Sequence, residues 1–122
     1  MSSIRPPDSW KGKFVTTLQV LLFVRERILA GVALEMFIGK LDINLFAAFI
    51  DGMQFHLYCS GIEDEEYQAF GAWLRDVCKE FPSPGGWEQK YLADTGGDHR
   101  AAILKFLDRC ADFVEKREET TY

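Results

Sequence analysis

The sequence predicts an all-α fold, a single compact domain of four or five helices. Apolar side chains recur at steps of three and four in several separate segments, which is the spacing of amphipathic helices. No segment shows a convincing strand-like alternation, and glycine, proline and capping residues separate the helical segments. With 122 residues, of which 48% are hydrophobic, the chain is long enough to bury a core without a disulfide or a metal.

Residues 1–12 contain Arg5-Pro6-Pro7-Asp8 and Gly12 and predict an irregular lead-in. A helical domain is predicted over 13–117, and its first helix runs from Lys13 to about Arg27. This helix is apolar on more than one face, which places it centrally in the fold. Its apolar residues are Phe14, Leu18, Leu21, Leu22 and Val24. Residues 28–41 are compatible with a continued helix or an extended segment, and Gly39 is expected to turn the chain.

A second helix is predicted from Asp42, whose carboxylate can accept free backbone N–H groups, to about Tyr58. Its apolar stripe consists of Phe46, Phe49, Ile50, Met53 and Leu57. Gly52 lies inside this helix and predicts that another backbone packs close to it. The run Ser60-Gly61-Ile62-Glu63 matches a capping box that would open a third helix. The apolar residues of that helix are Tyr67, Phe70, Leu74, Val77, Cys78 and Phe81.

The prolines and glycines that follow Phe81 end the third helix, and a short fourth helix is predicted from Trp87 to Asp94. Gly96 and Gly97 favour a left-handed C-cap, and Asp98 caps a last helix. The apolar stripe of this last helix is Ile103, Phe106, Leu107, Cys110, Phe113 and Val114. Residues 118–122 are expected to form a polar tail that frays.

Charge and cysteine content limit the class of protein. The chain carries 19 acidic and 14 basic residues, and its net charge of −5 argues against nucleic-acid binding. Residues 41–122 hold sixteen acidic and eight basic side chains, which either steer a cationic partner or serve solubility alone. The three cysteines form no CxxC pair, which fits a reducing cytoplasm. No long apolar run stands near the N-terminus, so we expect no signal peptide. Arg25, Glu26 and Arg27 split the most apolar region into halves too short to span a membrane, so we expect no membrane insertion.

Few residues suggest metal or thiol chemistry. His56 and Cys59 share a helical face, and Cys78, His99 and Cys110 are the residues that would complete a zinc site. The spacing is not that of a known zinc module, so ordinary packing is the favoured interpretation. A cysteine nucleophile would require Cys59 beside His56, and no third residue is placed to orient that histidine. We therefore expect no catalytic residue, no metal and no cofactor.

Two groups of side chains are candidates for partner binding. Four consecutive carboxylates start the third helix, where they interact with the helix dipole or form a docking patch for a basic partner. Two aromatic residues near the fourth helix are anchors for either the core or an interface. These candidate residues are Glu63, Asp64, Glu65, Glu66, Trp87 and Tyr91.

A series of short segments extends over roughly residues 14–114. They are Met36-Phe37-Ile38-Gly39, Phe49-Ile50-Asp51-Gly52, Phe70-Gly71-Ala72-Trp73-Leu74, Trp87, Gly97-Asp98, Ile103 and Phe106-Leu107. In this order they resemble a family of small uncharacterised bacterial proteins associated with toxin-immunity genes. The chain has Ala33-Leu34-Glu35 where the family has Arg-Pro-Gly. The resemblance implies a small cytosolic binding protein and supplies no catalytic residues.

The leading hypothesis is a non-enzymatic immunity protein that neutralises a cognate bacterial toxin by occluding its functional surface. One alternative is a small metal- or thiol-dependent enzyme centred on His56 and Cys59. Another is a helical structural subunit whose exposed aromatic residues form a homodimer, and the sequence leaves the oligomeric state open. We expect a cytoplasmic protein whose partner is the toxin, with no nucleic-acid partner.

Overall fold

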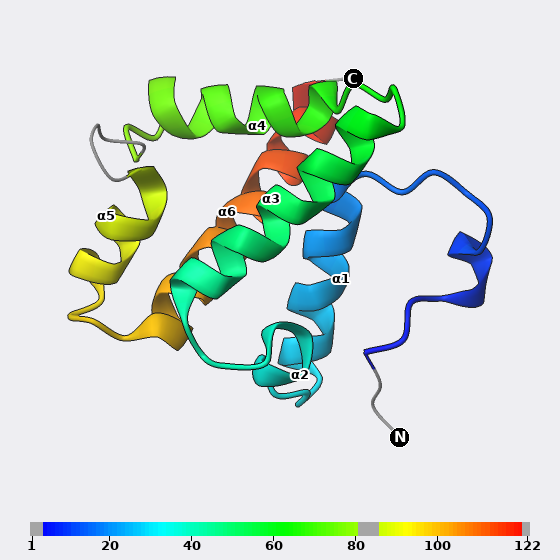
Figure 1. Cartoon of the computed structure of the whole chain (residues 1–122). Helices are drawn as coiled ribbons and strands as arrows, with labels where there is room; N and C mark the ends of the chain where they lie inside the picture. Colours follow the sequence, from blue (N-terminus) through cyan, green and yellow to red (C-terminus); the bar gives the residue numbers. More distant parts are fainter. Residues whose placement is uncertain (1–3, 81–85, 121–122) are drawn as a thin grey trace.

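The described part of the chain, residues 4–80 and 86–120 of this computed structural model, folds into α-helices and one 3-10 turn (Figure 1). The elements are η1 (Asp8–Trp10), α1 (Thr17–Leu29), α2 (Glu35–Ile38), α3 (Ile43–Cys59), α4 (Glu65–Asp76), α5 (Gly86–Asp94) and α6 (His99–Thr120). No strand occurs among these residues, so the prediction of an all-α domain is confirmed. The five longer helices match the predicted ones, and α2 adds a single turn.

The long helix α6 lies at the centre of the fold and contacts α1, α3, α4 and α5. In Figure 1, α3 crosses in front of α6, α1 and α5 lie on opposite sides, and α4 covers one end. The buried side chains of these helices form a single apolar core. None of the helices in the described ranges combines the length and apolarity needed to cross a bilayer.

Aromatic side chains fill the part of the core where α3, α4, α5 and α6 meet. The Trp87 ring stacks on the Phe106 ring with centroids 3.8 Å apart. Phe46 and Phe70 pack edge-on against the same Phe106 ring, at 6.0 and 5.5 Å. Such offset and edge-to-face contacts add to the stabilisation from buried area. Trp87 therefore anchors α5 against α6.

Helix α1 begins at Thr17, four residues later than predicted. Thr16 and Gln19 form a reciprocal capping box at this point, so the preceding residues lie outside the helix. Phe14 is accordingly exposed, although it was predicted to belong to the apolar face. Residues 28–41 form neither one continued helix nor an extended segment, because α1 ends at Leu29 and the separate turn α2 follows. Gly39 turns the chain with a φ of 81°, as predicted.

Helix α3 begins after Asp42, whose carboxylate accepts a hydrogen bond from the Asn44 N–H at 2.8 Å, so the predicted N-cap is confirmed. The predicted apolar stripe of α3 faces the core. The expectation about Gly52 is wrong, because a Cβ at this position would meet no atom within 4 Å. Gly52 is exposed, and no atom of the described residues comes within this distance of the added Cβ.

The predicted capping box at Ser60–Glu63 is also wrong. The Ser60 hydroxyl donates to the His56 carbonyl at the end of α3, while the carboxylate of Asp64 caps α4. Helix α4 ends at Asp76, so Val77 is exposed and Cys78 lies beyond the helix. The backbone then changes direction at Lys79, whose φ is 60°. The predicted helix end at Phe81 lies outside the described residues.

The last two helices follow the prediction closely. Gly96 and Gly97 adopt φ values of 66° and 87°, and the Asp98 carboxylate accepts from the Ala101 N–H at 3.0 Å. Helix α6 continues to Thr120, beyond the predicted end of the domain at residue 117. Arg117 forms an ion pair with Glu66 of α4, which ties the last turns of α6 to the fold.

Candidate functional site

The four carboxylates at the start of α4 have different environments. Asp64 is only 6% exposed and accepts hydrogen bonds from the backbone N–H groups of Thr17 and Tyr67, at 3.2 and 3.3 Å. Glu66 accepts from the Thr16 hydroxyl at 3.1 Å and pairs with Arg117. Glu63 and Glu65 are exposed. The structure therefore gives Asp64 and Glu66 a role in joining helices, and the four residues do not form one open patch.

The two predicted aromatic anchors belong to the core. Trp87 is 5% exposed and Tyr91 is fully buried. Their rings lie 6.0 Å apart, and Trp87 stacks on Phe106. We correct the assignment of Trp87 and Tyr91 as interface anchors accordingly, because an anchor must project from the surface into its partner.

Tyr91 instead belongs to a polar network that links the segment after α4 to α5 and α6. Its hydroxyl donates to Glu80 Oε1 at 2.9 Å, and Arg109 Nε donates to the same oxygen at 2.7 Å. Lys105 Nζ lies 3.7 Å from the other oxygen of Glu80. Burial alone would raise the pKa of Glu80, but the hydrogen bonds from Arg109 and Tyr91 bring it below its ordinary value. Glu80 is thus a satisfied, ionised carboxylate that holds three segments together.

The residues considered for metal or thiol chemistry are dispersed. His56 and Cys59 are exposed on α3, whereas Cys110 is fully buried in the core, where burial raises the pKa of its thiol. His99 Nδ1 accepts a hydrogen bond from the Ile43 N–H at 3.0 Å, so it joins the starts of α3 and α6. Within residues 4–80 and 86–120, no three histidine, cysteine or acidic side chains converge as a metal site would require.

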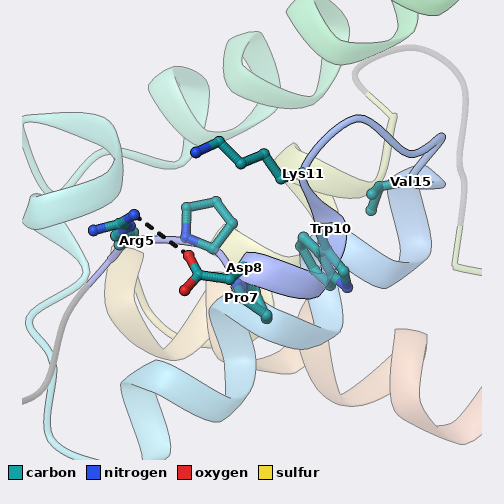
Figure 2. A pocket seen from close by; sticks show the side chains of 7 residues that line it. Arg5, Pro7, Asp8, Trp10, Lys11 and Val15 are labelled. Atoms are coloured by element: carbon teal, nitrogen blue, oxygen red, sulfur yellow. Dashed lines mark hydrogen bonds and ion pairs between the residues drawn. The ribbon is translucent and has the colours of Figure 1, made fainter.

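One hollow lies beside the N-terminal segment and has a volume of about 350 Å³. Figure 2 shows the ion pair between Arg5 and Asp8 in this hollow, with Trp10 and Val15 further along its wall. The distance between Arg5 Nη2 and Asp8 Oδ1 is 3.3 Å, and both side chains are largely exposed. Trp10 packs against Phe23 of α1 with ring centroids 5.4 Å apart. All described lining residues of this hollow thus come from the segment before α1, which Trp10 anchors on that helix.

A second hollow of about 460 Å³ lies between α1 and α3. Val20, Phe49 and Met53 line it, and His56 is the one titratable residue among its described lining residues. The hollow is apolar and open, and it carries no set of polar groups that would orient a small molecule.

A third hollow, which we call the acidic groove, lies between α3, α4 and α5 and has a volume of about 370 Å³. Asp51 of α3 and Glu88 of α5 line it together with Tyr67 and Gln68 of α4. Burial is the main cause that raises the pKa of Tyr67, and the nearby charges of Asp51 and Glu88 contribute to the same shift. No lysine, arginine or histidine is among the described residues that line the groove.

The side of α3 that points away from α6 carries an exposed stripe, which we call the outer face of α3. It consists of Ala48, Asp51, Phe55 and Tyr58, spaced by three, four and three residues, so that they share one face of the helix. The side chains of Phe55 and Tyr58 are 71% and 83% exposed. Asp51 belongs to both this face and the acidic groove, so the two surfaces are continuous.

Sequence reasoning did not select Asp51, Phe55 or Tyr58. The helical spacing predicts their exposure, because these residues fall between the apolar positions assigned to the core and therefore lie on the opposite side of α3. The segment Ile43–Cys59 contains a single carboxylate and no lysine or arginine, which is unusual for a helix with a solvent-exposed side.

Comparison of the chain with protein-family models, with curated proteins and with solved structures finds no match.

Proposed function

We propose that this chain is a non-enzymatic protein-binding domain and that its binding surface is the outer face of α3 together with the acidic groove. The observation that carries the proposal is the exposure of Phe55 and Tyr58 on an otherwise ordered helix of the bundle. Large aromatic side chains are enriched in protein interfaces, where they become buried anchors.

The charge of the molecule supports a basic partner. Residues 41–122 carry sixteen acidic and eight basic side chains, and they include all residues of the proposed surface. A net negative charge accelerates the association of a cationic protein, and Asp51 and Glu88 place two carboxylates at the proposed surface. The aromatic residues then supply most of the affinity once the two proteins are in contact.

We propose further that the partner is a bacterial toxin and that the domain acts in the cytoplasm as its immunity protein. The resemblance to toxin-immunity proteins is the support for this part of the proposal. Binding by occlusion needs only a stable domain with one complementary surface, and the helical bundle provides a rigid support for α3. No catalytic group is required of the inhibitor.

The test compares three tagged forms of the chain in extracts of the native host. They are the wild type, the variant Phe55→Glu/Tyr58→Glu, and the matched control Met36→Glu/Val77→Glu, which places the same charges on exposed apolar residues elsewhere. We expect one stoichiometric partner to be captured by the wild type and the control and lost with the α3 variant. Co-expression should then suppress the toxicity of that partner with the wild type and not with the α3 variant.

Two results would contradict the proposal. Capture that is the same for all three forms would remove the outer face of α3 from the interface. A doubled mass in light scattering that returns to the monomer value in the α3 variant would identify this face as a homodimer contact instead.

A further inference from the structure

The acidic groove combines two carboxylates with an aromatic wall. Asp51 and Glu88 approach it from α3 and α5, and neither forms an ion pair with any residue in the described ranges. In contrast, Glu66, Glu80 and Asp94 are all paired with arginine or lysine. The groove thus holds two negative charges with no counter-ion from the described residues.

The wall of the groove suits a flat cation. Tyr67 is the partly exposed aromatic residue of its lining, while the buried rings of Phe70, Trp87 and Phe106 close its floor. Gln68 adds a polar group at α4. A guanidinium group is planar, stacks on aromatic rings and donates to carboxylates from a rigid fork, whereas an ammonium group is a compact and more strongly hydrated charge. The volume of about 370 Å³ lies in the range of small-ligand sites.

We propose that the acidic groove receives an arginine side chain of the protein partner, held between Asp51 and Glu88. This inference rests on the proposed function, because the arginine is supplied by the protein that docks on the outer face of α3. Asp51 connects the two surfaces, so an arginine in the groove would fix the register of the partner relative to Phe55 and Tyr58. The groove thereby supplies specificity, and the aromatic residues supply contact area.

The test uses the purified, isotope-labelled full chain and a defined probe, N-acetyl-arginine amide, titrated by NMR. The matched probe is N-acetyl-citrulline amide, which has nearly the same shape and no charge. We expect saturable shifts of the Trp87 indole N–H and the Gln68 side-chain amide with the arginine probe, and none with the citrulline probe. In the variant Asp51→Asn/Glu88→Gln the dissociation constant should rise by at least about tenfold.

The control variant Glu26→Gln/Glu115→Gln removes the same charge from exposed positions outside the groove. It should bind the arginine probe like the wild type. The single variants Asp51→Asn and Glu88→Gln should each have a dissociation constant between those of the wild type and the double variant. Equal binding of the two probes would overturn the proposal. A dissociation constant that changes equally in the groove variant and the control would also overturn it.

This experiment needs no partner, so its result is separable from that of the proposed function. If the groove binds the arginine probe while Phe55→Glu/Tyr58→Glu leaves partner capture unchanged, the arginine site is supported and the proposed function is contradicted. If that variant loses partner capture and the groove does not respond to the arginine probe, the proposed function is supported and the arginine site is contradicted.

Discussion

Asp64 and Thr17, 47 residues apart in the sequence, are joined by two hydrogen bonds that both end on one carboxylate oxygen. The Thr17 backbone N–H and hydroxyl both donate to Asp64 Oδ2, and Gln54 Nε2 of α3 lies 3.2 Å from the same oxygen. The other oxygen of Asp64 caps α4 at the Tyr67 N–H. One buried carboxylate therefore satisfies the starts of two helices and contacts a third.

Replacing Asp64 with alanine should lower the free energy of unfolding by about 2–4 kcal/mol. Loss of an N-cap accounts for about 1 kcal/mol, and the rest comes from leaving the buried N–H and hydroxyl of Thr17 without an acceptor. Urea unfolding followed by circular dichroism measures this difference. The neighbouring Glu63→Ala is the control, because Glu63 is exposed and its replacement should change stability by less than about 0.5 kcal/mol. Equal effects of the two substitutions would contradict the role of Asp64.

Local patterns were sufficient to predict most of the helices. Asp42 and Asp98 have the predicted capping role, and the stripes around Phe46, Phe70 and Phe106 face the core. The prediction of a capping box at Ser60 is wrong because Ser60 caps the end of α3 instead. The residue that caps α4 is Asp64, and its position is fixed by a hydrogen bond from the distant Thr17. Such a contact between distant segments has no local signature in the sequence.

The candidate site was harder to predict than the fold. Trp87 and Tyr91 were ambiguous between core and interface, because aromatic residues serve both and only the packing of α5 on α6 decides between them. Glu80 was not singled out, since its partners Tyr91 and Arg109 come from other segments. The helical period places Phe55 and Tyr58 on one side of α3. Predicting that this side is exposed also requires knowing which side of α3 contacts α6.

Trp87 should contribute strongly to stability because its ring is buried against Phe106. We expect Trp87→Ala to cost about 3–5 kcal/mol of unfolding free energy, as is typical of large aromatic residues in a core. The exposed Tyr58→Ala should cost less than about 0.5 kcal/mol in the same urea titration. A small effect of Trp87→Ala would contradict the stacked arrangement and make Trp87 a candidate interface anchor again.

The network around Glu80 predicts a specific pH dependence of stability. Its pKa in the folded protein is below the ordinary value, so the unfolded chain takes up the proton first as the pH falls. The stabilisation is therefore present above the unfolded pKa of about 4.3 and is lost as the pH falls through the native pKa. We expect Glu80→Gln to be less stable than the wild type by about 1–3 kcal/mol near neutral pH.

The two proteins should converge in stability as the solution is acidified from about pH 7 to about pH 3, because protonation removes the same charge from the wild type. Urea unfolding across this range measures the convergence. A difference between the wild type and Glu80→Gln that stays constant down to the lowest pH would contradict the assignment of Glu80 as an ionised, hydrogen-bonded carboxylate.

Gly52 offers the opposite prediction, a substitution that stabilises. It lies inside α3 with a backbone conformation open to any residue, and an added Cβ would meet no atom within 4 Å. Alanine restricts the unfolded chain more than glycine does, so Gly52→Ala should raise the free energy of unfolding by about 0.5–1 kcal/mol. Gly39 is the matched control, because its surroundings are equally open but its φ is 81°. Gly39→Ala should therefore destabilise by about 1 kcal/mol. If Gly52→Ala destabilised the protein instead, another part of the molecule would have to pack against α3 at this point, as the sequence first suggested.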